Sequence, residues 1–299
     1  MTNVRGLGGQ TSIALKPGCQ LRRATAAEVA FIKQTAQRLG ALAWFPQPIW
    51  EIEWKDGAGK ALPESKWRYF VIAFMGSNEI MEDVRAAGHI ARGELDCAFT
   101  AIHAKMRDSF TSGWTQHSLR LVNDLWEFDD EKLFIEITHE RAAELASLCS
   151  QIAAHDSSGI DVRQHALALG DLKTLHWQSK LRFLGRFAIL ESLLTHPPKP
   201  SDPADSLTRQ IVSKIALLDN RWKHRLDYAR FDGAVSDRVW KAMYAYRSAA
   251  AHGDKPDFKK DLKVLKSAND ASALLQDAVK AVLRHALAEP QLMLDLKRC

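Results

Sequence analysis

The sequence lacks the motifs that mark common nucleotide, metal and hydrolase sites. Its only Gly-Lys pair, Gly59-Lys60, is followed by Ala61 and not by the Ser or Thr of a phosphate-binding loop. His139-Glu140 is followed by Ala143 where a zinc protease needs its second histidine. The patterns GxSxG and GxGxxG are also missing. We therefore expect neither a metal ion nor an organic cofactor.

Cysteine and long apolar segments are scarce as well. The four cysteines are far apart and none has CxxC spacing. Isolated cysteines of this kind are typical of proteins in a reduced compartment. The first residues do not form a basic segment followed by a continuous apolar run. Since no stretch approaches the roughly 18 apolar residues of a membrane span, we expect a cytoplasmic protein without a membrane partner.

Length and charge point to two domains of different character. The chain has 299 residues, 46% of them apolar and 26% charged, which is enough for two ordinary cores. Residues 1–140 carry a net charge of −2 and residues 141–299 a net charge of +7. The positive field of the second half favours a polyanionic partner such as nucleic acid.

The first half mixes helical and strand patterns. We predict a flexible leader over residues 1–12, which are rich in glycine and polar residues, and an α+β sensor or regulatory domain over residues 13–138. A helix is expected from Thr25 to Gly40, because Glu28 follows Thr25 at capping-box spacing. Branched and aromatic runs predict strands within residues 49–54, 67–75, 95–104, 119–128 and 133–137.

One segment of this half allows an alternative function. Residues 20–33 have the strand-then-helix opening of Gcn5-type acetyltransferases, which bind pyrophosphate at a helix start. The nearest match to the phosphate loop of those enzymes is Arg85 to Ile90, where a bulky isoleucine occupies a position that must let the backbone approach phosphate. A plain sheet domain explains the segment better.

Residues 139–299 predict an all-α helical bundle. Apolar residues recur there at intervals of three to four. The expected helices cover residues 140–155, 171–194, 206–220, 236–250 and 271–290. The proline-rich segment 196–205 is expected to be a loop inside this domain.

The end of the helix predicted at 236–250 carries the residues best suited to chemistry. Val239, Met243, Tyr246 and Ala250 form an apolar stripe, and Arg247 lies beside it with His252 five residues further on. Arginine offers a planar, permanently charged fork for phosphate, and histidine can transfer protons. Ordinary capping of a helix end is the alternative explanation. In the helix predicted at 171–194, Glu191 borders the apolar stripe, and a carboxylate so close to a core requires a cationic partner such as Arg247.

These segments resemble a known superfamily. RFAILESLLTH, a short polar loop, SLTRQIVSKIALLDN and a helix ending in YRSAAAHG are similar to the HEPN superfamily, in particular its Apea-like branch, whose signature is an Arg, four residues and a His. The resemblance covers roughly residues 140–290. It implies a helical bundle that forms a homodimer, with the two Arg-His motifs meeting in a cleft. Many members are metal-independent endoribonucleases that act as toxins or antiphage effectors.

The resemblance assigns roles to residues. Arg247 and His252 correspond to the catalytic pair, with Glu191 and Ser248 in support. Active members commonly have Asn, Asp or His directly after the Arg, so Ser248 departs from the pattern and leaves a supporting contact in doubt. Two copies of His252 in a dimer could supply both the base and the acid for cleaving RNA to a 2′,3′-cyclic phosphate and a 5′-hydroxyl.

The remaining expectations concern partners. Lys259, Lys263 and Lys266 have the spacing of one helix face, and the RNA backbone is expected to contact the lysines at 255, 259, 260, 263 and 266. Because an unregulated nuclease would harm its host, we expect a trigger or regulator to bind the N-terminal domain. The alternative is a non-catalytic HEPN-type module for RNA or protein binding and dimerisation.

Overall fold

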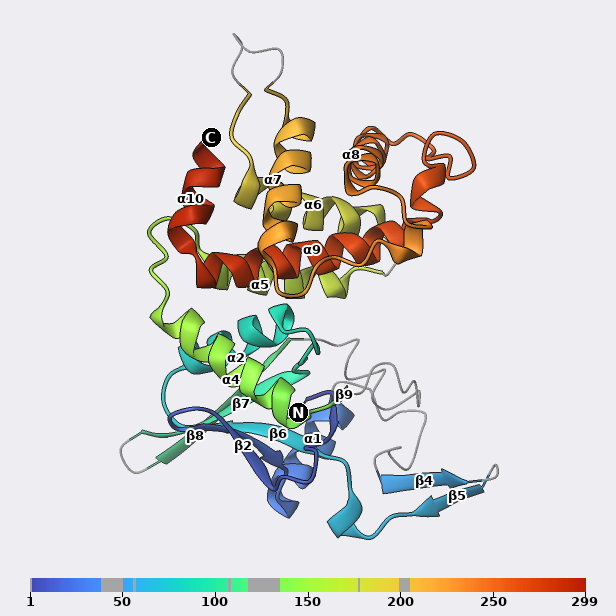
Figure 1. Cartoon of the computed structure of the whole chain (residues 1–299). Coiled ribbons are helices and arrows are strands. Elements are labelled where there is room, and N and C mark those ends of the chain that lie inside the picture. Colours follow the sequence, from blue (N-terminus) through green and yellow to red (C-terminus); the bar gives the residue numbers. More distant parts are fainter. Residues whose placement is uncertain are drawn as a thin grey trace. The chain divides into compact units, whose positions relative to one another are not determined.

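The computed structural model describes residues 2–38, 51–55, 58–106, 109–117, 135–176, 178–198 and 205–299. The chain divides into two compact units, Met1–Ala153 and Ala154–Cys299. A small strand-rich part comes first and a mostly helical part follows (Figure 1). The coarse prediction of an α+β domain before a helical one is confirmed.

The N-terminal unit contains short strands and three described helices. Its central sheet is antiparallel, in the order β2–β3–β6. Two hairpins stand beside it, β4–β5 and β7–β8, and β1 pairs with β9. The strands are β1 (Val4–Gly6), β2 (Ser12–Lys16), β3 (Cys19–Arg23), β4 (Ile52–Lys55), β5 (Ala58–Ala61), β6 (Phe70–Phe74), β7 (Phe99–Met106), β8 (Ser109–Gln116) and β9 (Ile135–Glu136), and the helices are α1 (Ala26–Arg38), α2 (Asn78–Ile90) and α4 (His139–Ala154).

The capping box predicted at the start of α1 is present. The Thr25 backbone N–H donates to the Glu28 carboxylate over 2.7 Å, and the Glu28 N–H donates to the Thr25 hydroxyl over 3.3 Å. Arg22 on β3 donates two hydrogen bonds of 2.8 Å to the same carboxylate. These bonds hold the pKa of Glu28 well below its usual value, at about 2. The predicted strand at 119–128 and the predicted helix end at Gly40 lie outside the described residues.

The prediction of a flexible leader over residues 1–12 is wrong. Thr2, Asn3 and Val4 are buried, and β1 pairs in parallel with β9. The Asn3 side chain donates to the Glu94 carbonyl over 3.0 Å and accepts from the Asp96 N–H over 2.9 Å. Residues 2–6 are held by partners that lie 68 residues or more away in the chain, which local composition does not reveal.

The structure also excludes the phosphate loop of the acetyltransferase alternative. Arg85 to Ile90 form the second half of α2 and not a loop. Gly88 is required there by close packing, because a Cβ at this position would lie 2.4 Å from the Leu95 carbonyl oxygen. This glycine therefore serves contact between a helix and the following segment.

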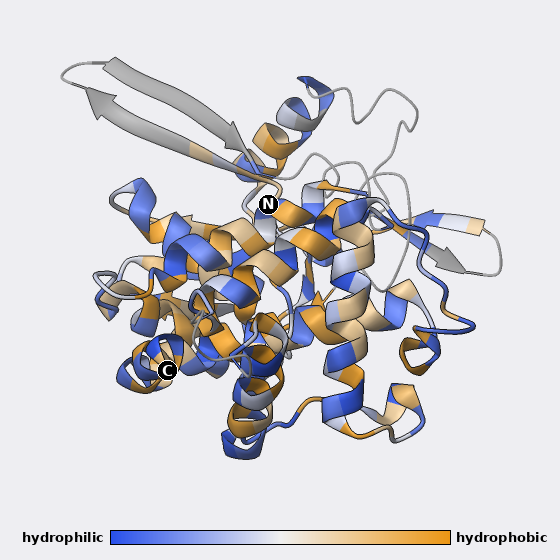
Figure 2. Cartoon of the chain, turned by 90° about the horizontal axis from the view of Figure 1, so that it is seen from above, coloured by the Kyte–Doolittle hydropathy of each residue, from blue (hydrophilic) through white to orange (hydrophobic). Residues whose placement is uncertain are grey.

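The C-terminal unit contains helices and no strand among its described residues. The long helix α9 packs on α5, α6 and α10, while α7 and α8 pack on each other. Figure 2 shows that these helices carry both hydrophobic and hydrophilic residues. The helices are α5 (Val162–Asp171), α6 (Lys180–Leu194), α7 (Leu207–Arg221), α8 (Ser236–His252), α9 (Ala268–Ala288) and α10 (Pro290–Arg298).

The helix predicted at 171–194 is interrupted in the structure. The single helix expected at 171–194 is instead the end of α5, a 3-10 turn at Leu172–Thr174 and α6. The turn folds back onto α6, where the Leu172 side chain packs against Gly185. A Cβ added at Gly185 would lie only 2.4 Å from that side chain. Helix α5 begins at an Asp161 cap that accepts from the Gln164 N–H over 2.9 Å.

The boundary between the units lies one helix later than the predicted division at residues 138 and 139. Almost all of helix α4 belongs to the N-terminal unit. Arg92, just after α2, forms ion pairs of 3.0 Å with Glu140 and 3.2 Å with Glu144 of α4. The helical pattern begins at His139, but the first helix of this pattern, α4, belongs to the N-terminal unit.

Candidate functional site

Helix α8 presents the Arg-His motif at its C-terminal end. Val239 and Met243 are fully buried and Tyr246 and Ala250 nearly so, which confirms the predicted stripe. The helix ends at Gly253, whose φ of 81° is the left-handed conformation that glycine adopts without strain. At the start of the helix, the Ser236 hydroxyl donates to the Tyr228 hydroxyl over 3.0 Å, and Val235 takes the capping position.

Arg247 forms the predicted ion pair with Glu191. The two side chains come from α8 and α6, and Arg247 Nη2 lies 3.1 Å from Glu191 Oε2. The Arg247 side chain is 32% exposed and the Glu191 side chain 16% exposed. Among the described residues, Arg247 makes no other hydrogen bond, and Glu191 Oε1 is buried without one. The arginine is therefore held in place by one N–H group while others remain able to bind a ligand.

Aromatic packing fixes the distance between α6 and α8 around this pair. The rings of Phe183 and Tyr246 lie 4.4 Å apart, and those of Phe187 and Tyr244 lie 5.8 Å apart in an edge-to-face arrangement. Phe183, Phe187 and Tyr246 belong to the buried stripes of the two helices, and Tyr244 is half-buried beside them. This packing places Glu191 and Arg247 opposite each other at the border of the core.

Tyr244 is a member of the site that sequence reasoning missed. The Arg247 guanidinium lies over its ring, 5.7 Å from the centroid. Burial and the nearby charge of Glu191 raise the pKa of Tyr244, so the phenol stays protonated at neutral pH. Its spacing of three residues from Arg247 on one helix is a signal that could have identified it.

His252 occupies the last turn of α8 and is exposed. Its imidazole makes no hydrogen bond to any described residue. Five helical positions correspond to about 140° around the axis and about 7.5 Å along it, so Arg247 and His252 point in different directions. The structure places both at one helix end but does not join them by a direct contact. Ser248 lies between them in the sequence and is half-buried, and its hydroxyl makes no hydrogen bond in the described part of the chain.

The lysines after the motif do not form the predicted helix face. Residues 257–262 form turns, and a 3-10 turn at Lys263–Leu265 follows. The Asp257 carboxylate accepts from the backbone N–H groups of Lys259 and Lys260, which favours turns over an α-helix. All five lysines at 255, 259, 260, 263 and 266 are nevertheless exposed.

Only one of these five lysines is ion-paired within the described residues. Lys266, at a φ of 59°, forms a 2.5 Å pair with Asp232, whose φ of 55° is also left-handed. The other four present free ammonium groups on the loop that follows His252. A second contact joins this loop to α6, because Lys180 donates to the Asp254 carbonyl over 3.0 Å. Sequence reasoning missed Lys180, since its partner is 74 residues away and nothing in the local pattern indicates the contact.

The described ranges contain neither a candidate metal site nor a candidate membrane span. There, no cluster of three or more His, Cys, Asp or Glu side chains could hold a metal ion. None of the helices described is long and apolar enough to cross a membrane.

Comparison with known proteins leaves the site as the main guide to function. No family model, no curated protein and no solved structure matches the chain.

Proposed function

We propose that the C-terminal unit is a metal-independent endoribonuclease of the HEPN type that acts as a homodimer. The observation that carries the proposal is the end of α8, where an arginine oriented by a largely buried carboxylate shares the helix end with an exposed histidine that has no partner among the described residues. This is the pair of groups that RNA cleavage without a metal requires: one that binds phosphate and one that transfers protons.

The chemistry follows from these two groups. Arg247 binds a non-bridging phosphate oxygen through the N–H groups that Glu191 leaves open, and stabilises the charge that develops on phosphorus. His252 removes the proton from the ribose 2′-hydroxyl. The 2′-oxygen attacks phosphorus, the bond to the 5′-oxygen breaks, and that oxygen takes up a proton. The products are a 2′,3′-cyclic phosphate and a 5′-hydroxyl.

A second copy of the chain completes the site in this proposal. One imidazole cannot accept and donate a proton at the same moment, and Arg247 and His252 of one chain diverge around α8. In a symmetric dimer, the second His252 protonates the leaving oxygen and the second Arg247 binds the same phosphate. By the family resemblance, the nuclease serves as a toxin or antiphage effector. Because an unregulated nuclease would harm its host, its activity is controlled through the N-terminal unit in this proposal.

The test incubates the protein with tRNA and a single-stranded RNA in EDTA. We expect wild type to cleave and to leave cyclic phosphate ends, and His252→Ala to lose at least 100-fold in rate, a loss typical for removing a general base. His252 is the sharpest variant because its side chain supports no hydrogen bond within the described residues. Lys241→Ala is the matched control, since it removes an exposed cation from the same helix outside the site.

The non-catalytic alternative predicts a different pattern. If α8 serves only binding and pairing, the Arg247–Glu191 contact is purely structural. His252→Ala would then leave RNA processing unchanged, and Arg247→Ala would change only stability or dimerisation. Two results would reject the nuclease. One is equal cleavage by wild type and His252→Ala. The other is a wild-type protein that forms a stable dimer and binds RNA but does not cleave it.

A further inference from the structure

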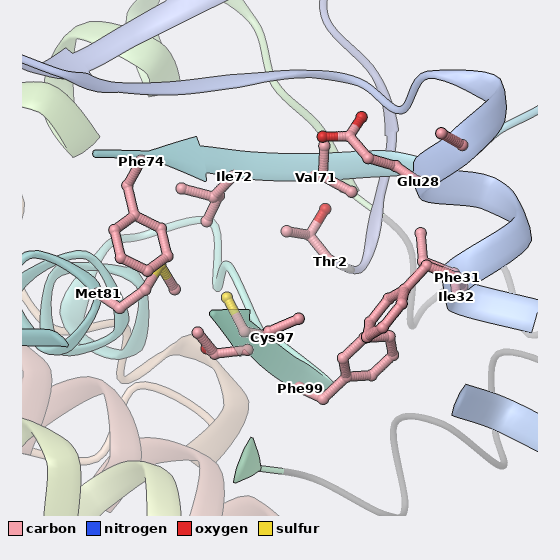
Figure 3. Close-up of a pocket in the computed structure, with 13 residues that line it drawn as sticks. Thr2, Glu28, Phe31, Ile32, Val71, Ile72, Phe74, Met81, Cys97 and Phe99 are labelled. Carbon is pink, nitrogen blue, oxygen red and sulfur yellow. The ribbon is translucent and has the colours of Figure 1, made fainter. Parts of the chain in front are cut away.

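The N-terminal unit contains a cavity of about 370 Å³ that is separate from the Arg-His site. Its walls come from α1, β6, α2 and the segment that enters β7 (Figure 3). Phe31 and Ile32 line one side, and Phe74 and Met81 line the other, with Phe99 below (Figure 3). The cavity is partly open to the outside, and its volume lies within the range of small-molecule sites.

The polar groups of the wall are already bonded within the protein. The Glu28 carboxylate is bound by Arg22 and Thr25. The Thr2 hydroxyl donates to the Phe70 carbonyl over 3.2 Å, and the Thr100 hydroxyl lies 2.7 Å from His117 Nε2. A charged ligand would find no unpaired counter-charge among these groups and would lose its hydration. The wall therefore favours a neutral occupant.

Aromatic side chains favour one kind of neutral occupant. The rings of Phe31 and Phe99 lie 6.4 Å apart at an angle of 53°. Phe99 is buried while Phe31 is half-exposed, so one ring is fixed and the other borders the opening. Tilted rings at this spacing offer both a face and an edge to a third ring. Met81 adds a polarisable sulfur, which also packs well on aromatic rings.

We propose that this cavity binds a small, uncharged aromatic molecule of one or two fused rings. An apolar cavity of about 150 Å³ binds a single benzene ring, so this larger space accommodates a bicyclic compound. The inference stands on the cavity alone and does not depend on the proposed nuclease activity.

The first experiment titrates the whole protein with a neutral fluorescent probe that has two fused rings, 6-propionyl-2-(dimethylamino)naphthalene. We expect saturable binding of one probe per chain. 2-Methylnaphthalene should displace it, whereas the anionic isostere 2-naphthoate should not do so at tenfold higher concentration. Non-saturable binding, or equal displacement by both compounds, overturns the proposal.

Cavity-filling variants locate the probe. Cys97→Phe and Val71→Phe add a ring to the lining and should weaken binding at least tenfold. The matched controls, Cys299→Phe and Val235→Phe, add the same ring at exposed positions and should bind as wild type does. Unchanged binding by both cavity variants, with cooperative melting, places the probe elsewhere and rejects the proposal.

A second measurement needs no cavity-filling substitution. In the wild-type protein, aromatic ring currents from the probe should shift the NMR signal of the Met81 methyl group, which lines the cavity. The Met75 methyl group is 83% exposed and should not shift. The Met81→Leu and Met75→Leu variants assign the two signals, and a shift at Met75 alone would contradict the proposal.

Discussion

The two carboxylate oxygens of Glu191 have different surroundings. Oε2 accepts from Arg247 over 3.1 Å, whereas Oε1 is buried and accepts no hydrogen bond among the described residues. Such a carboxylate depends on its single cation, because loss of that cation leaves a charge with little solvation. The same dependence makes Arg247 both a structural and a chemical residue.

This dependence predicts coupling between the two residues. Arg247→Ala should lower the free energy of unfolding by about 1–3 kcal/mol, the cost of leaving a buried polar group without its partner. Adding Glu191→Gln should recover part of that loss because the buried group is then neutral. Urea denaturation of both single variants and the double variant measures the coupling. Strictly additive effects would show that the pair contributes nothing to stability.

His117 predicts a pH dependence in the N-terminal unit. Burial, with a smaller effect from the charge of Arg85, lowers the pKa of His117 to about 4. Between pH 6.5 and 4 the unfolded chain therefore binds a proton that the folded chain does not, and stability falls as the pH falls. One such group changes the free energy of unfolding by at most about 1.4 kcal/mol per pH unit.

Denaturation at pH 7 and pH 5 tests this dependence. We expect His117→Gln, which keeps a neutral polar side chain, to lose less stability than wild type over this interval. Identical losses would show that His117 is not the group responsible.

At the scale of elements, the end of α8 controls where His252 lies. Gly253 and Gly233 both have positive φ, 81° and 70°, and an added Cβ would meet nothing within 4 Å at either position. The two glycines are therefore equivalent in local strain, but only Gly253 adjoins the histidine.

This equivalence gives a matched pair of variants. Gly253→Ala and Gly233→Ala should each cost about 1 kcal/mol of stability, because alanine is strained in the left-handed conformation. Only Gly253→Ala should also reduce RNA cleavage, through displacement of His252. Melting temperatures and cleavage rates of the two variants provide the comparison, and equal cleavage would show that the helix end does not position the histidine.

Elements with local causes were predictable from the sequence. Thr25 and Glu28 define the start of α1 by their spacing, and the stripes of α6 and α8 identified both Glu191 and Arg247. Elements fixed by distant contacts were not: β1 depends on β9, and Gly88 depends on the Leu95 backbone. The lysine segment was misread because regular spacing suggested a helix, whereas Asp257 holds the backbone in turns.

At the scale of the whole molecule, the positive charge is concentrated in residues 141–299. Lys255, Lys259, Lys260 and Lys263 are exposed on one loop after the motif and make no ion pair with a described residue. Charges of this kind bind RNA by releasing counterions, so their effect depends on salt.

The salt dependence of RNA binding gives a quantitative prediction. For a single-stranded RNA, the triple variant Lys259→Ala, Lys260→Ala, Lys263→Ala should reduce the slope of log affinity against log salt by about 2, at about 0.7 per phosphate contact. Lys266→Ala should change the slope less, since Asp232 already neutralises that lysine. Binding titrations at several salt concentrations measure both, and an unchanged slope for the triple variant would remove this loop from the interface.

The pairing of β1 with β9 also governs the order of events during synthesis. Val4 lies beside Ile135, so these strands meet only after about 130 further residues have left the ribosome. Contacts between such distant residues slow folding because a long loop must close first. Strand β1 is therefore fixed in place late, and until then Val4 and the preceding residues Thr2 and Asn3, all buried in the folded protein, are available to chaperones.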